Sequence, residues 1–233
     1  MNKTAPKSQE GNHHKKATRK SLASSSPNSF AFTDADLKTM AKHLPHAFPT
    51  VQGLFWHGAN TNGPLADIAM LGWPEAQNVR EGIVRGHRRK SGKAFSYCLW
   101  PELLQWYKER ARAKADYYVF PELVFSERER RNPAFNNLEV PATGKAARIF
   151  ATRMRALKVF NAFLVEAGFK HPLISFKSLR YHNFGLCVRH GVPGPLAMAA
   201  CGTGPKNNYT AVSDTQIRRL NELTRAAWLT AMQ

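Results

Sequence analysis

The stretch that most constrains the fold is GIVRGHRRKSGKAFSYCLW, residues 82–100. Its second half alternates, because Phe95, Tyr97 and Leu99 are separated by smaller side chains, and a period of two is typical of a β-strand. The Ser-Gly pair at 91–92 favours a tight turn between two strands. PELLQWYKERARAK follows directly and places a proline where a first helical turn accepts one. We therefore expect an antiparallel hairpin that leads into a helix.

Helical signals dominate the rest of the sequence. Thr33 with Asp36 three residues later forms a capping-box pattern, which is typical of a helix start. The predicted helices begin at Thr33, span 101–114 and 145–167, lead from SFKSLRYHNF to Gly191, span 195–200 and begin at Ser213, where Gln216 completes a second capping box. DYYVFP is predicted as a short strand or extended segment. The predicted class is α+β, mostly helical, with a small antiparallel sheet near the N-terminal half.

The charge balance indicates a polyanionic partner. The sequence has 34 Lys and Arg against 16 Asp and Glu, a formal net charge of +18. Such an excess destabilises a compact chain through self-repulsion, so we expect nucleic acid, or secondarily an anionic membrane surface, to neutralise it. Residues 1–28 are polar, basic and Ser-rich, which predicts a disordered tail that could lie on phosphates or act as a solubilising linker. Residues 29–233 are predicted to form the folded domain.

Several classes of protein are excluded by what the sequence lacks. It has no apolar run long enough for a membrane span and no apolar stretch of a signal peptide at its start. The three cysteines, at positions 98, 187 and 201, show no metal-ligand spacing, which favours reduced thiols and a cytoplasmic protein, nucleoid-associated if bacterial. No Gly-rich phosphate loop, paired-carboxylate motif, HExxH motif or serine nucleophile elbow occurs. We expect no cofactor and no metal.

Seven short motifs carry the strongest functional signal. In chain order they are FTDADLKTM, NGPLADIAMLGW, RRKSGKAFSYCLWPELLQW, FKSLRYHNF, HGVPGPL, CGTG and NNYTAVSD. Their order and spacing resemble the catalytic domain of the tyrosine recombinases, the phage-integrase family, from about residue 32 to the C-terminus. Each motif is weak alone, so the resemblance rests on the order and spacing of all seven. It implies a recombinase-like catalytic fold that acts on double-stranded DNA, in some members as a homo-oligomer.

The resemblance assigns a catalytic role to four residues. Tyr209 falls on the nucleophile, Arg180 on the second arginine and Lys90 on the hairpin lysine, with Lys93 as a close rival. Lys177 occupies the place of the usual histidine and can still donate to a phosphate. A surface arginine, a solvated hairpin tip and a packing tyrosine are the plainer interpretations of Arg180, Lys90 and Tyr209.

Two positions depart from the family pattern. Pro64 stands where the first arginine is expected, with Asp67 at the neighbouring acidic position, and Gly202-Thr203 stands where the family has Gly-His. In the implied reaction, tyrosine attacks a DNA phosphodiester and the two arginines stabilise the negative charge that develops on the phosphate oxygens. Proline has no donor, and the loss of one preorganised donor costs about 3–4 kcal/mol of transition-state stabilisation. We therefore expect strand breakage and rejoining to be impaired.

Further basic residues are predicted to contact the DNA backbone, although a solvated helix face would show the same pattern. They are Arg148, Arg153 and Arg155 on the long helix, and Arg88, Arg89 and Lys93 in the hairpin. Three functions stay open: a strand-transfer enzyme, a catalytically inactive DNA-binding protein on the same fold, and an unrelated basic RNA-binding protein. The family usually has a further N-terminal helical domain that closes around DNA, so we expect the chain to be a fragment, the product of a truncated gene or a minimal form that relies on its tail.

Overall fold

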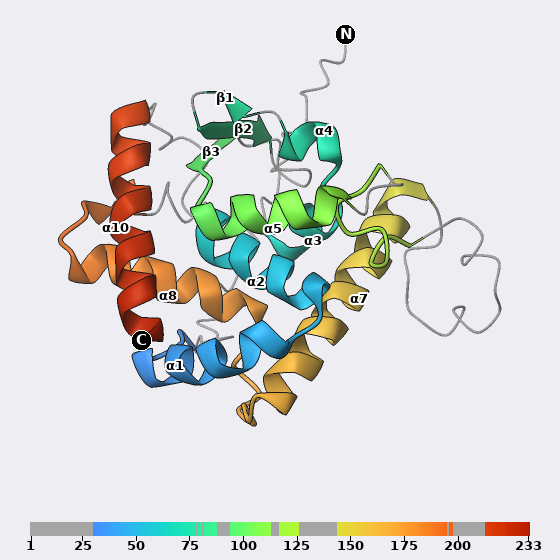
Figure 1. The fold of residues 1–233 in the computed structure, drawn as a ribbon, viewed down its shortest axis with the longest axis horizontal. Coiled ribbons are helices and arrows are strands. Elements are labelled where there is room, and N and C mark those ends of the chain that lie inside the picture. The colour runs from blue at the N-terminus through green and yellow to red at the C-terminus, as the bar shows by residue number, and fades with distance from the viewer. Residues whose placement is uncertain are drawn as a thin grey trace, which may run out of the picture.

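The computed structural model describes residues 30–77, 79–80, 82–87, 94–112, 117–125, 144–194, 196–197 and 213–233. The predicted tail, residues 1–28, and the start of the predicted domain lie outside the described residues. Figure 1 shows helices gathered around a central helix, α2, with the strands together at one edge. The expected mostly helical α+β class with a small antiparallel sheet is therefore confirmed.

The described helices and strands follow one another along the chain in this order. The helices are α1 (Asp34–His43), the 3-10 helix η1 (Leu44–His46), α2 (Pro49–Thr61), α3 (Leu65–Ala69), α4 (Trp73–Ala76), α5 (Pro101–Arg112), α7 (Gly144–Glu166), α8 (Phe176–Arg189) and α10 (Asp214–Met232). The strands β1 (Val79–Arg80), β2 (Ile83–His87) and β3 (Ala94–Cys98) form one antiparallel sheet in the order β1-β2-β3. The short β1 is an addition to the predicted hairpin.

Helix α2 is central because its sequence is apolar on most sides. A helix that is hydrophobic all round is stable only when other elements cover it. Two glycines let those elements approach closely: a Cβ at Gly53 would lie 2.2 Å from Trp106 of α5, and one at Gly58 would lie 2.4 Å from Leu179 of α8. The backbone of α2 is thus pressed between α5 and α8, and its C-terminal end lies inside the molecule.

The predicted helix ends are confirmed by their caps. The Thr33 side chain accepts from the Asp36 backbone at 3.1 Å, and the Asp36 carboxylate accepts from the Thr33 backbone at 2.7 Å. Ser213 and Gln216 form the second capping box at the start of α10. The long helix α7 has the predicted extent to within a residue at each end, and Gly168, with φ of 89°, follows it in the left-handed region that glycine enters readily.

The predicted strand or extended segment DYYVFP is described from Tyr117 onward and lies outside the three-stranded sheet. Tyr118 makes a single antiparallel bridge to Gly72, and two backbone hydrogen bonds of 2.9 Å join 117–119 to 71–73. The segment continues as bends and turns to Phe125, whose backbone donates to the Thr152 hydroxyl of α7 at 3.1 Å. It is therefore fastened both to the 71–73 backbone and to α7.

The alternation in β3 is typical of a sheet with one face exposed to solvent, but the structure packs side chains against both faces of this strand. Tyr97 is half-buried on the side of α2, whereas Cys98 is buried with Ile83 and Ile217 on the other side. Ile217 belongs to α10, which packs on that face of the sheet and is anchored to β2 by the ion pair Arg85–Asp214 at 2.6 Å. Sequence periodicity could not indicate this because the covering helix is more than a hundred residues away in the chain.

Candidate functional site

Arg180 lies where α8 crosses the turn between α2 and α3. Its Nε and Nη2 both donate to the backbone oxygen of Asn62, at 3.1 Å and 2.7 Å, across 118 residues of chain. The side chain is half-buried. A guanidinium that donates twice from one edge to one oxygen is held in a fixed plane. Arg180 is thus an ordered part of the fold and not a loose surface arginine.

The turn that Arg180 holds has an unusual backbone. Asn62 follows α2 with φ of 52° and ψ of 19°, the left-handed region, where asparagine is one of the few residues found at low cost. Pro64 comes two residues later and caps α3 in an extended conformation. The position that the recombinase resemblance gives to the first arginine therefore lies next to the carbonyl that the second arginine binds.

A polar network supports this turn, and we call it the asparagine junction: Asn62, Arg180, Asn183 and Trp228. The Asn183 amide nitrogen donates to the Ala59 carbonyl at 2.7 Å and to the Asn62 side-chain oxygen, and its own oxygen accepts from the Trp228 indole. Both Asn183 and Trp228 are at most 1% exposed. Every polar atom of the Asn183 side chain is therefore bonded, as a buried amide requires.

Asn60, near the end of α2, is also buried but bonds to other partners. Its nitrogen donates to the Cys98 carbonyl at 2.8 Å and to the Asn221 side chain at 3.0 Å, while its oxygen accepts from the Trp100 backbone at 3.0 Å. These bonds fasten α2 to the end of β3 and to α10. The two asparagines thus use similar chemistry for different tasks.

Lys177 lies one turn before Arg180 on α8. Its ammonium is exposed and sits 5.0 Å from the centroid of the Tyr181 ring, within the range of a cation–π contact. Residues three apart lie on one face of a helix, so Lys177 and Arg180 belong to the same side of α8. Of the four predicted catalytic residues, these two are brought together on one helix face.

The arginines of α7 have different surroundings, which we call the α7 seam: Arg148, Thr152 and Arg155 against Tyr118, Val124 and Phe125. The guanidinium of Arg148 lies 5.3 Å from the Tyr118 ring centroid, and that of Arg155 lies 5.1 Å from the Phe125 ring centroid. Arg153 lies on the exposed side of the helix. The first two hold the segment 117–125 in place, and Arg153 is the one of the three that faces solvent.

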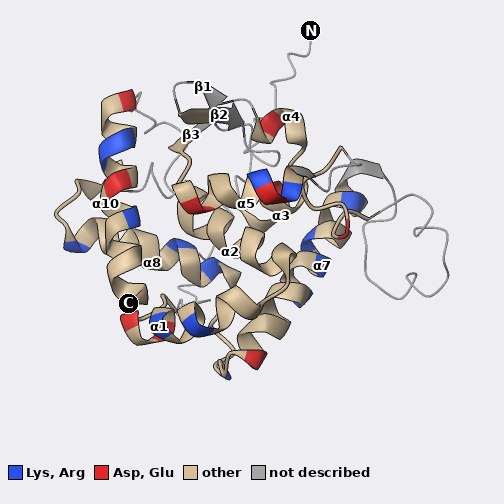
Figure 2. Ribbon diagram, viewed as in Figure 1, with Lys and Arg blue, Asp and Glu red and all other residues tan. Residues whose placement is uncertain are grey.

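The remaining predicted site residues lie outside the described residues. They are Lys90 and Tyr209 among the catalytic candidates, and Arg88, Arg89 and Lys93 among the DNA contacts. Figure 2 shows the described basic positions spread over α1, α7, α8 and α10, with acidic positions between them on α10. Positive charge is therefore distributed over several described helices and not confined to one of them.

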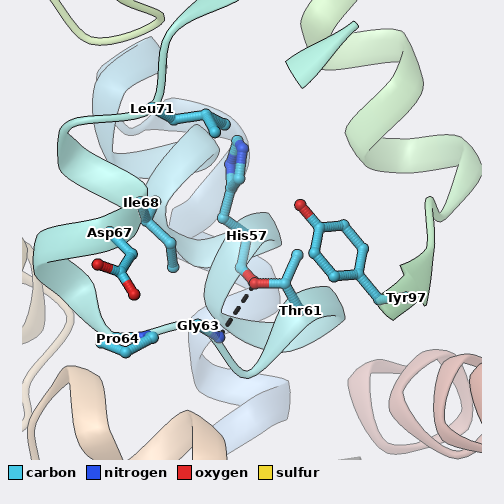
Figure 3. A pocket seen from close by; sticks show the side chains of 8 residues that line it. All are labelled: His57, Thr61, Gly63, Pro64, Asp67, Ile68, Leu71 and Tyr97. Carbon is cyan, nitrogen blue, oxygen red and sulfur yellow. Dashed lines mark hydrogen bonds between the residues drawn. The ribbon is translucent and has the colours of Figure 1, made fainter. Parts of the chain in front are cut away.

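A small pocket opens beside the turn at Pro64 (Figure 3). It is lined by His57, Thr61, Gly63, Pro64, Asp67, Ile68, Leu71 and Tyr97, with a volume of about 40 Å³. That is room for one or two water molecules and not for a nucleotide. Within it the Thr61 hydroxyl accepts from the Gly63 backbone at 3.0 Å, which rigidifies the turn. The pocket is part of how the turn is built and is no substrate site.

His57, at the back of this pocket, is a structural histidine. Its Nδ1 donates to the Gly53 carbonyl at 2.7 Å, so its Nε2 accepts from the Tyr107 hydroxyl at 2.6 Å. Burial lowers the pKa of His57 to about 4. Burial also lowers the pKa of His182, whose Nδ1 donates to the Phe32 carbonyl at 2.7 Å. Both rings are neutral at pH 7, and neither serves as a source of protons for a reaction.

Among the described residues, no group of three or more His, Cys, Asp or Glu could hold a metal ion, and none of the helices has the length and apolarity that crossing a bilayer requires. No protein-family model matches the chain, and neither does any curated protein or solved structure. The resemblance to the recombinases consequently stays a prediction from the motifs.

Sequence reasoning missed Asn62 and Asn183. The Asn-Gly pair at 62–63 is a turn signal and could have pointed to the left-handed residue. Nothing in the sequence marks Asn183, because a polar residue in a helix becomes informative only when its burial is known.

Proposed function

We propose that this chain is a DNA-binding protein with a tyrosine-recombinase-like catalytic domain, in which DNA strand breakage and rejoining are impaired. Double-stranded DNA is the partner, and no cofactor takes part. The basic residues hold the phosphate backbone, and Arg180 with Lys177 marks the place where a scissile phosphate would lie.

The contact between Arg180 and Asn62 carries this proposal. The resemblance expects two segments far apart in the sequence to share one phosphate site: one around the first arginine and one around the second. Arg180 touches the first of these segments two residues before Pro64. Motifs that matched by chance would have no reason to meet in space, so this meeting supports the recombinase-like assignment.

The same contact supports the impairment. The guanidinium of Arg180 gives two of its five N–H groups to the Asn62 carbonyl, and Pro64 supplies no donor beside it. A phosphorane needs several preorganised donors around its oxygens. The site therefore favours holding a phosphate over stabilising the transition state. This observation favours the second candidate function, an inactive DNA-binding protein on the same fold.

Binding is tested by measuring duplex affinity across a range of salt concentrations. We expect the logarithm of the affinity to fall linearly with the logarithm of salt, with a slope of about −0.9 for each phosphate neutralised. Arg180→Ala should weaken binding by about tenfold or more, since charge-assisted hydrogen bonds are lost. A stronger affinity for structured RNA than for duplex DNA would instead favour the RNA-binding alternative.

Chemistry is tested by incubation with nicked duplexes, followed by denaturation. An adduct that survives denaturation and is absent from Tyr209→Phe would demonstrate strand breakage through a phosphotyrosine. Salt-sensitive binding without any adduct would identify the inactive DNA-binding protein. Absence of duplex binding would contradict both forms of the proposal.

A further inference from the structure

One turn of α8 hydrogen-bonds to both oxygens of Asn62, the backbone oxygen and the side-chain oxygen. Arg180 binds the backbone oxygen, and Asn183, three residues later on the same helix face, binds the side-chain oxygen. Both contacts are made while the Asn62 backbone is left-handed, with φ of 52°. Loss of either oxygen, or of the left-handed conformation, would remove part of the support of Arg180.

This arrangement orients the guanidinium before any ligand arrives. The bonds from Nε and Nη2 fix the plane of the group, and with it the direction of its outer edge. A side chain that is already ordered loses less conformational freedom when it binds a phosphate. An arginine anchored in this way is a better phosphate ligand than an unrestrained one.

Asn183 also connects Arg180 to the last helix. The Asn183 oxygen accepts a hydrogen bond from the Trp228 indole of α10. Both groups are buried, so if this bond broke, water could not take the place of the lost partner. A displacement of α10 at Trp228 must break this bond or move Asn183. The segment that carries Tyr209 leads directly into α10.

We infer that Asn62 and Asn183 are positioning residues for Arg180, and that Trp228 makes this alignment depend on the position of α10. The inference rests on the proposed function, since it takes Arg180 to be a phosphate contact. Asn183 acts without touching DNA: it holds Asn62, which in turn holds Arg180.

A double-mutant cycle separates positioning from general stabilisation. Duplex affinity is measured by fluorescence anisotropy for the wild type, Asn183→Leu, Arg180→Ala and the double variant, each checked for folding by circular dichroism. We expect Asn183→Leu to weaken binding about tenfold in the wild-type background and less than about twofold when Arg180 is absent. An equal factor in both backgrounds would show a merely structural role and overturn the inference.

Asn60→Leu is the matched control. It removes another buried asparagine with three hydrogen bonds, none of them to Asn62 or Arg180. Any effect of Asn60→Leu on affinity should be the same with and without Arg180.

A gentler pair of variants covers the case in which Asn183→Leu fails to fold. Asn62→Gly keeps the left-handed backbone but loses the oxygen that Asn183 holds, so we expect it to bind about tenfold more weakly than the wild type, as Asn183→Leu does. Asn62→Ala loses the same oxygen and also disfavours that backbone, so it should bind more weakly than Asn62→Gly. Wild-type affinity of Asn62→Gly would overturn the inference.

A measurement without DNA distinguishes failure of the inference from failure of the proposed function. The Nε–H resonance of Arg180 should be protected from solvent exchange in the wild type and in Asn60→Leu, and should lose protection in Asn183→Leu. Retained protection in Asn183→Leu overturns the positioning role. Lost protection together with unaltered DNA binding by Arg180→Ala overturns the assignment of Arg180 as a phosphate contact, and with it the function of the alignment.

Discussion

The asparagine junction and the α7 seam both contain arginines that the sequence assigned to DNA, but they hold them differently. In the junction, Arg180 donates to a backbone oxygen within a network of directional hydrogen bonds. In the seam, Arg148 and Arg155 lie over aromatic rings. A cation over a ring keeps much of its orientational freedom, whereas a bidentate donor does not. The comparison teaches that the role of an arginine depends on which groups hold its guanidinium in place. The residue type alone does not show which groups these are.

Acid should destabilise the contact of α2 with α5 at His57, and this is the largest effect we expect. Burial lowers the pKa of His57 from its ordinary 6.5 to about 4. Between these two pH values the imidazole is protonated in the unfolded chain and neutral in the folded protein. The stabilising contribution is complete above pH 6.5 and is lost as the pH falls towards 4, by roughly 3 kcal/mol. Chemical denaturation across this range measures it.

His57→Gln is the control for that measurement, because glutamine is polar and does not titrate. It should flatten the pH dependence of the unfolding free energy, and the lowered pKa of His182 should leave a smaller slope of the same sign. An unchanged slope in His57→Gln would show that other groups cause the acid sensitivity.

Exchange of arginine for lysine should separate the two regions in DNA binding. Arg180→Lys loses the planar fork that holds the Asn62 carbonyl, and we expect duplex affinity to fall about tenfold, or about 1.4 kcal/mol. Arg155→Lys keeps a cation over the Phe125 ring and should bind DNA as the wild type does. Anisotropy titrations at one salt concentration compare them. Equal losses would mean that the seam also contacts DNA.

Truncation in the seam should affect stability instead. Arg155→Ala removes the contact with the Phe125 ring and the weak hydrogen bond to the Val124 carbonyl at 3.5 Å, and should lower the free energy of unfolding by about 1 kcal/mol. Thermal denaturation measures this loss. Arg153→Ala, two residues away on the exposed side, should leave the free energy of unfolding within about 0.5 kcal/mol.

Arg153→Ala should show the smallest effect, on salt dependence alone. If Arg153 neutralises one DNA phosphate, its loss reduces the salt slope of binding by about 0.9 and leaves stability unchanged. The comparison with Arg155→Ala then divides α7 into a DNA-facing side and a structural side. An unaltered slope would remove Arg153 from the proposed DNA contacts.

Local features of the fold were predictable because their causes are local. The caps at Thr33 and Ser213, the extent of α7 and the strands β2 and β3 depend on residues within a few positions of one another. The placement of the segment 117–125 has the opposite cause. The stretch DYYVFP favours a strand or an extended segment, but its partners, the 71–73 backbone and the side chains of Arg148 and Thr152, come from elsewhere in the chain.

The candidate site divides in the same way. Sequence motifs singled out Arg180 and Pro64 and connected them through a family resemblance. They could not show that Arg180 binds the Asn62 carbonyl beside Pro64. They also could not show that Asn183 holds the Asn62 side chain and is itself held by Trp228. These bonds join parts of the chain that are 118, 121 and 45 residues apart, and no periodicity or spacing rule reaches across such separations.

The sequence by itself determined the starts of α1, α5 and α10, the extent of α7, the paired strands β2 and β3 and the excess of positive charge, since each follows from residues that are near one another or from composition. Only the tertiary structure decided which arginines are ordered and which groups order them. That decision depends on burial, because a polar group removed from water must find its partners wherever the fold supplies them. Arg180 is held by a backbone oxygen, whereas Arg148 and Arg155 lie over aromatic rings.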